Sequence, residues 1–142
     1  MDLPERVKVV SLWARWAMAV AEGIKTLETR EWEIDPGPLV IHAGKQLDGD
    51  IPGRIEPFPW VRHVQPGTIC ALVWVVKCRP LVPEDKPRAL VYRPGLFAWE
   101  LEHRIRLAPV PMTGPRKIGY IDRTMVLEAM NRANPPHYTD RD

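Results

Sequence analysis

The stretch Gly23-Ile24-Lys25-Thr26-Leu27-Glu28-Thr29-Arg30 carries the most information in this sequence. Alternation over residues 25–32 predicts a strand, which would place Glu28 and Arg30 on one face, about 6.6 Å apart along the chain. Lys25 starts this strand just after the glycine, so its ammonium group can project into the mouth of a cleft. A flexible point charge of this kind suits a phosphate or a carbonyl oxygen. A carboxylate beside it can accept a hydrogen bond from an exocyclic amine of a base. A guanidinium can bind a phosphate or carbonyl bidentately.

The residues before this stretch predict a strand followed by a short helix. Apolar residues alternate over 7–13, and an alanine-rich amphipathic pattern follows over 14–21. Ser11 is expected to cap this helix, and Gly23 is expected to end it where a positive φ is usually needed. Trp13 and Trp16 lie at the helix start, next to the motif. Each could stack on a base or pack in the core, and the sequence leaves both open.

The residues after the motif predict three more strands and a terminal helix, at 39–45, 68–78, 97–107 and about 122–133. A proline-rich loop over 46–66, a charged loop over 82–95 and a loose tail over 134–142 complete the chain. Few helical patterns separate the strands. This order favours an α+β, mainly β fold, a mixed small barrel, over a doubly wound sheet. We expect one domain over 1–142.

Composition limits the classes of function. The net charge of +2 is too small for bulk attraction to nucleic acid, so any such binding must come from a local patch. The N-terminus lacks a signal pattern, and the longest apolar run, at 69–76, is too short to span a bilayer. We therefore expect a soluble cytoplasmic protein with no membrane partner. The four histidines and two cysteines show no metal-ligand spacing, and nothing in the sequence demands a cofactor.

Four segments together resemble one family. The motif above fits the pattern GxKxxExR, and SLWARWA (11–17), LVIHAGK (39–45) and FAWELE (97–102) follow the family's other blocks in the same order. The chain thereby resembles the ASCH domain family of the PUA-like superfamily. Arg15 stands where proline is common in that family.

The resemblance implies both a fold and a class of ligand. It implies a PUA-like mixed β-barrel with the first helix packed across one opening and a cleft lined by the motif side chains. Its implied partner is RNA or a small nucleobase-like ligand, with no obligate protein partner. Some small members are hydrolases or nucleases, and one subgroup deacylates acetylated cytidine with the motif lysine and a threonine. The chain departs from that subgroup because Glu28 stands at the threonine position.

The candidate ligand-binding residues are Ser11, Trp13, Trp16, Lys25, Glu28, Arg30, His42 and Lys45. Lys25 and Glu28 are also candidates for catalysis if the chain is a hydrolase, which the sequence leaves open. Glu28 and Arg30 could instead form an internal ion pair that braces the barrel, and His42 could be a structural core residue. A protein-interaction module is a further alternative. The sequence reveals no nucleophile paired with a base, which favours binding over catalysis.

Overall fold

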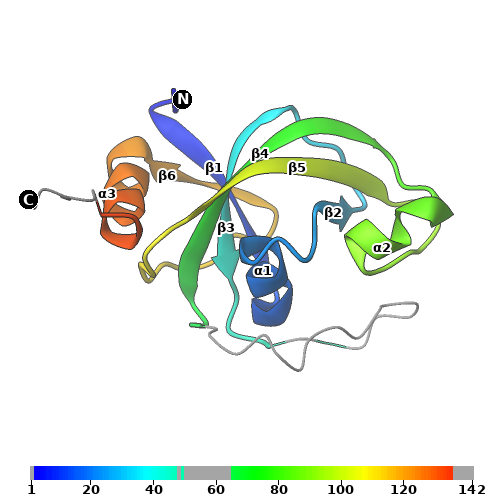
Figure 1. Cartoon of the computed structure of the whole chain (residues 1–142), viewed down its shortest axis with the longest axis horizontal. Helices are drawn as coiled ribbons and strands as arrows, with labels where there is room; N and C mark the ends of the chain where they lie inside the picture. The colour runs from blue at the N-terminus through cyan, green and yellow to red at the C-terminus, as the bar shows by residue number, and fades with distance from the viewer. Residues whose placement is uncertain (1, 48, 50–64, 136–142) are drawn as a thin grey trace, which may run out of the picture.

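The computed structural model describes residues 2–47, 49 and 65–135. Within these residues, six strands form one curved sheet in the order β2-β5-β4-β3-β1-β6, and three helices accompany it (Figure 1). The strands are β1 (Arg6–Leu12), β2 (Leu27–Arg30), β3 (Gly37–Ala43), β4 (Thr68–Pro80), β5 (Phe97–Arg106) and β6 (Ile118–Asp122). The helices are α1 (Ala14–Ala21), α2 (Lys86–Ala89), which follows the 3₁₀ turn η1 (Pro83–Asp85), and α3 (Arg123–Ala133).

The sheet is mixed, as expected. β1 and β3 pair in parallel, whereas the other neighbouring strands of the described sheet pair antiparallel. The long strands β4 and β5 arch over α1, so the sheet curls into a half-barrel (Figure 1). The protein therefore has the mainly β, α+β fold that the sequence predicts, with the first helix in the opening of the curved sheet.

Each face of the sheet is covered by a different helix. Because alternate strand residues point to opposite faces, β1 sends Val10 and Leu12 toward α1 and Val7 and Val9 toward α3. Nearly every residue of α1 is buried, and four of them are alanines, whose small side chains let the helix approach the strands closely. The helix α1 and the core around it therefore sit inside the curve of the sheet.

The start of α1 differs from expectation. Ser11 does not cap this helix, because it still lies in β1, and Trp13 occupies the N-cap position without a side-chain hydrogen bond. The amides of Ala14 and Arg15 instead donate to the backbone oxygens of Gln46 and Leu47, each at 2.9 Å. These bonds attach the segment after β3 to the start of α1.

The strand expected over 25–32 is shorter in the structure. Gly23 ends α1 with a φ of +80°, as expected, and the amides of Ile24 and Lys25 then donate back to the oxygen of Ala19. These two residues are therefore tied to the helix, and β2 begins only at Leu27. Lys25 consequently lies outside the strand alternation that the sequence analysis assigned to it.

Three further features were not expected from the sequence. β6 pairs with β1, and the charged segment over 82–95 contains η1 and α2. In β5, His103 has a φ of +58°, and Glu102, His103 and Arg104 are all exposed, so the predicted alternation breaks there. α3 spans Arg123–Ala133, where the sequence predicts a helix at about 122–133. Most of the loop over 46–66 and of the tail over 134–142 lies outside the described residues.

The extent of the single domain over 1–142 stays a prediction. No helix in the described ranges is long and apolar enough to cross a membrane.

Candidate functional site

A cavity of about 440 Å³ opens between α1, β2 and the segment that follows β3. Seven of the eight predicted site residues line it: Ser11, Trp13, Trp16, Lys25, Glu28, Arg30 and Lys45. Six further lining residues were not predicted from the sequence: Leu12, Thr29, Gly44, Gln46, Val91 and Pro115. We call this space the motif cavity, because the GxKxxExR side chains converge on it.

Glu28 sits between two cations in the wall of the motif cavity. Its Oε1 is 3.7 Å from Nζ of Lys25, and its Oε2 is 2.9 Å from Nε of Arg30. The contact between Glu28 and Arg30 is a largely buried ion pair. Arg30 also donates from Nη2 to the backbone oxygen of Ser11 at 3.0 Å, which links β2 to β1.

Lys25 is almost completely buried, with 3% of its side chain exposed. Its ammonium donates to the backbone oxygen of Ala89 and lies 5.1 Å from the centroid of the Trp16 ring, a cation–π contact. The pKa of Lys25 is lowered to about 8, mainly because burial disfavours the charged ammonium; Glu28 acts in the opposite direction, and the nearby Arg30 adds a smaller lowering effect. The amine of Lys25 therefore changes protonation close to neutral pH.

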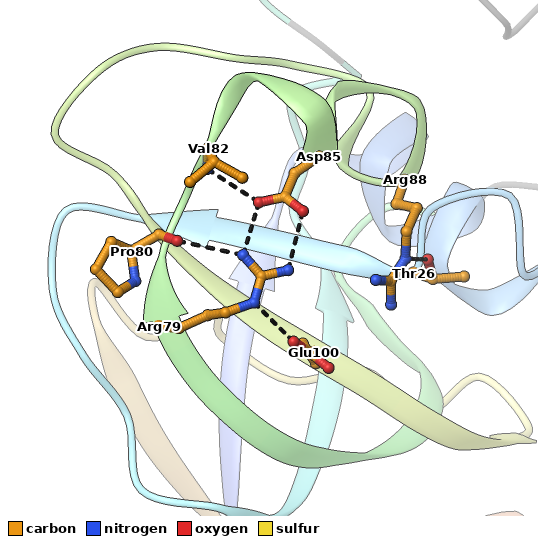
Figure 2. A network of polar contacts seen from close by, with 7 residues as sticks. All are labelled: Thr26, Arg79, Pro80, Val82, Asp85, Arg88 and Glu100. Carbon is orange, nitrogen blue, oxygen red and sulfur yellow. Dashed lines mark hydrogen bonds and ion pairs between the residues drawn. The ribbon is translucent and has the colours of Figure 1, made fainter.

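A polar network fixes the segment that supplies the Ala89 oxygen. Arg79 of β4 donates from both terminal nitrogens to Asp85, at 2.7 and 2.9 Å, and from Nε to Glu100 at 2.7 Å (Figure 2). Asp85 also accepts from the amide of Val82 at 3.0 Å. The hydrogen bonds from Arg79 and then from Val82 hold the pKa of Asp85 below its ordinary value. Arg79 thereby joins Asp85 and Glu100 into one structural brace.

α2 is joined directly to the residues beside Lys25. The amide of Thr26 donates to the oxygen of Arg88 at 3.0 Å, and Arg88 Nε donates to Oγ1 of Thr26 at 3.2 Å (Figure 2). Leu90 then adopts a left-handed conformation with a φ of +65°, and Val91 after it lines the motif cavity. The brace around Arg79 therefore holds the segment that leads to Val91 at the motif cavity.

The tryptophans divide between core and cavity. Trp99 is a core residue: it is fully buried and makes an edge contact with Trp32 at a centroid distance of 5.0 Å. Trp16 is also buried, but it borders the motif cavity beneath Lys25. Trp13 is half-buried on the same cavity wall. Of these rings, Trp13 has the larger share of its surface accessible to a ligand.

His42 lies in a neighbouring cavity of about 610 Å³, whose lining shares Ser11, Gly44 and Lys45 with the motif cavity. His42 Nδ1 is 2.9 Å from Oγ of Ser11, and its Nε2 is 2.8 Å from the backbone oxygen of Met112. We call this space the histidine cavity. In the described part of the chain, no group of three or more His, Cys, Asp and Glu side chains is arranged to hold a metal ion.

These features define a class of protein: a small, mainly β half-barrel with a buried helix in its opening and a charged, tryptophan-lined cavity beside that helix. The sequence profile of the ASCH domain family matches residues 10–111, more than half of the chain. The chain belongs to the ASCH domain family.

Solved structures agree with this assignment. The crystal structure of ASCH from Zymomonas mobilis superimposes with a TM-score of 0.61 at 14% identity, covering 88% of this chain and 94% of that one. A point variant of that protein gives a TM-score of 0.58 at 15% identity, covering 89% and 96%. At such identities the likeness establishes the fold. No curated protein matches the chain by sequence.

Asp85→Asn is expected to lower the free energy of unfolding by about 2 kcal/mol, because hydrogen bonds to a charged partner are lost from a side chain that is largely buried. Urea denaturation measures the change. Arg93→Gln is the matched control: its ion pair with Glu31 is exposed, so the expected change is below about 0.5 kcal/mol. Equal effects of the two substitutions would show that the Arg79 network does not brace this segment.

Lys25 is expected to make stability depend on pH. Its pKa of about 8 in the folded chain is below the ordinary 10.5, so between these values the unfolded chain binds more protons. Stability contributed by this group therefore rises with pH across that window, by about 3 kcal/mol in total. Urea denaturation of the native chain and of Lys25→Met, which lacks the titrating group, isolates this contribution. A difference between the two that stays constant from pH 8 to 10.5 contradicts the expectation.

Proposed function

We propose that the motif cavity binds single-stranded RNA or a small nucleobase-like ligand. The observation that carries the proposal is that Lys25, Arg30 and Lys45, one carboxylate and two tryptophans converge on a single space of about 440 Å³. Ligand pockets typically have about 300–1,000 Å³ and combine aromatic walls with a few polar groups. The lining residues carry three cations against the one carboxylate of Glu28, which favours an anionic or carbonyl-rich ligand.

The contacts suggest a role for each group. Trp16 already lies under the Lys25 ammonium, so Trp13 is the better platform for a stacked base, a contact worth about 1–3 kcal/mol. Lys45, exposed at the rim, and Arg30, partly exposed, suit phosphate or carbonyl oxygens. Glu28 can accept from an exocyclic amine of the base. Lys25 supplies the third cation, at the buried end of the cavity.

The alternative in which the charged residues only brace the barrel is compatible with part of this geometry. Glu28 is paired on both sides, as a buried carboxylate must be. Bracing does not account for an accessible cavity lined by three cations. Perturbed ionisable groups that line a cavity are a common mark of functional sites.

A hydrolase that uses the same cavity is the second candidate, and the lowered pKa of Lys25 is the observation that favours it. An amine with a pKa of about 8 is partly neutral near neutral pH, as a general base must be. The two candidates predict opposite pH profiles. Binding through the cation weakens as the pH rises through about 8, whereas proton abstraction by the neutral amine speeds up. A protein-interaction module predicts neither profile.

Titration with nucleoside monophosphates and short single-stranded RNA is expected to quench tryptophan fluorescence. Because three cations line the cavity, the slope of log affinity against log salt should be shallow, on the order of two or three. Lys45→Met should reduce this slope by about one. Lys77→Met removes an exposed lysine of β4 outside the cavity lining and should leave the slope unchanged. Absence of quenching across the whole panel would rule out the proposal.

A further inference from the structure

Ser11 and His42 form a hydrogen-bonded pair across neighbouring strands. They face each other in the parallel register of β1 and β3, and Ser11 Oγ is 2.9 Å from His42 Nδ1. His42 Nε2 is 2.8 Å from the backbone oxygen of Met112. A carbonyl oxygen can only accept, so Nε2 carries the proton; in the neutral ring Nδ1 is then the acceptor, and the Ser11 hydroxyl donates to it.

The surroundings hold this pair in place. His42 is 2% exposed, and its ring is fixed at both nitrogens. A Cβ added at Gly114 would lie 2.7 Å from Ser11 Oγ and 2.8 Å from His42 Nδ1, so the absent side chain of Gly114 makes room for the pair. A hydroxyl within reach of a base, with the base oriented by a third group, is the arrangement that activates a serine nucleophile.

Ser11 also stands where a substrate could reach it. It borders both the motif cavity and the histidine cavity, so a group bound across their boundary would lie beside its hydroxyl. Arg30 donates from Nη2 to the backbone oxygen of Ser11 at 3.0 Å, which places a guanidinium next to the same residue. A cation there can stabilise negative charge that develops on a carbonyl oxygen under attack.

We infer that Ser11 is an acyl-accepting nucleophile and His42 its general base, acting on an ester or amide that spans the two cavities. Ser11 Oγ attacks the acyl carbon and gives its proton to His42 Nδ1. The tetrahedral intermediate then collapses, the bond to the leaving alcohol or amine breaks, and that group takes the proton from His42. Water, deprotonated by His42, hydrolyses the acyl-serine and restores the free hydroxyl. Every proton passed to His42 is returned.

The reacting pair does not depend on the proposed nucleobase binding. The identity of the leaving group does rest on that proposed function: a base-containing leaving group would occupy the motif cavity, and the acyl group would occupy the histidine cavity. The two ideas therefore fail separately. Covalent reaction at Ser11 tests the nucleophile, and fluorescence titration of the same protein tests the nucleobase site.

A fluorophosphonate carrying a linear alkyl chain tests the nucleophile. The serine oxygen attacks phosphorus, fluoride leaves, and the serine proton passes to the base, so an activated serine gains one stable adduct. Ser11 is the only serine in the sequence, so intact mass and peptide sequencing locate the adduct without ambiguity. We expect one adduct on Ser11 in the folded chain. The same chain in concentrated guanidinium chloride keeps the serine but loses the pair, and it should remain unlabelled.

His42→Gln removes the base and should slow labelling by about 100-fold or more. Its melting temperature is measured alongside, so that a variant that does not fold is recognised and the comparison of folded with denatured native chain decides the matter. An unlabelled Ser11 in the folded native chain overturns the inference. Labelling of a folded His42→Gln variant at the native rate overturns it as well. If labelling fails while nucleotide quenching persists, the nucleophile is rejected and the binding site is kept.

Discussion

The ammonium group of Lys25 is removed from water, and much of the site is arranged around compensating that charge. A buried cation is costly unless other groups replace its hydration. Here the replacements come from three elements: the ring of Trp16 in α1, the carboxylate of Glu28 in β2 and the oxygen of Ala89 in α2. The compensation is incomplete, because the pKa of Lys25 still falls to about 8.

The charged groups around Lys25 also need partners. Glu28 carries a charge that Arg30 balances on its other side, and Arg30 in turn donates to Ser11 of β1. Arg79 and Asp85 hold the turn before α2, whose Ala89 oxygen accepts from Lys25, against β4 and β5. One buried charge thus links α1, β1, β2 and α2. The motif cavity lies where these elements meet. It shares the lining residues Ser11, Gly44 and Lys45 with the histidine cavity.

The sequence pattern predicted those parts of the structure that interactions between neighbouring residues of the chain determine. The alanine-rich stretch gave the helix range later seen in α1, and Gly23 marked its end. Local pattern failed where long-range contacts decide. Ser11 does not cap α1, because the first helical amides donate to Gln46 and Leu47 instead. β2 starts late because the amides of Ile24 and Lys25 donate to the oxygen of Ala19. The sequence motifs predicted which side chains line a common cavity, and seven of the eight expected residues line the motif cavity.

The rest of the site could not be found from sequence for the same reason. Val91 lines the motif cavity, and it follows α2, the segment held by the hydrogen bonds from Arg79 to Asp85 and Glu100. His42 was expected in the same site as Lys25, but the register of β1 and β3 places it beside Ser11 in the histidine cavity. The pair was invisible in sequence because 31 residues separate its members, and only strand pairing brings them together.

The pKa of the Lys25 amine, measured by NMR of the side-chain nitrogen with and without a saturating nucleoside monophosphate, tests the central claim most directly. We expect a value of about 8 in the free protein and a higher value in the complex, because a bound phosphate or carbonyl stabilises the ammonium form. A lysine with its ordinary pKa of 10.5 in the free protein, or one whose pKa does not change on addition of the nucleotide, would contradict it.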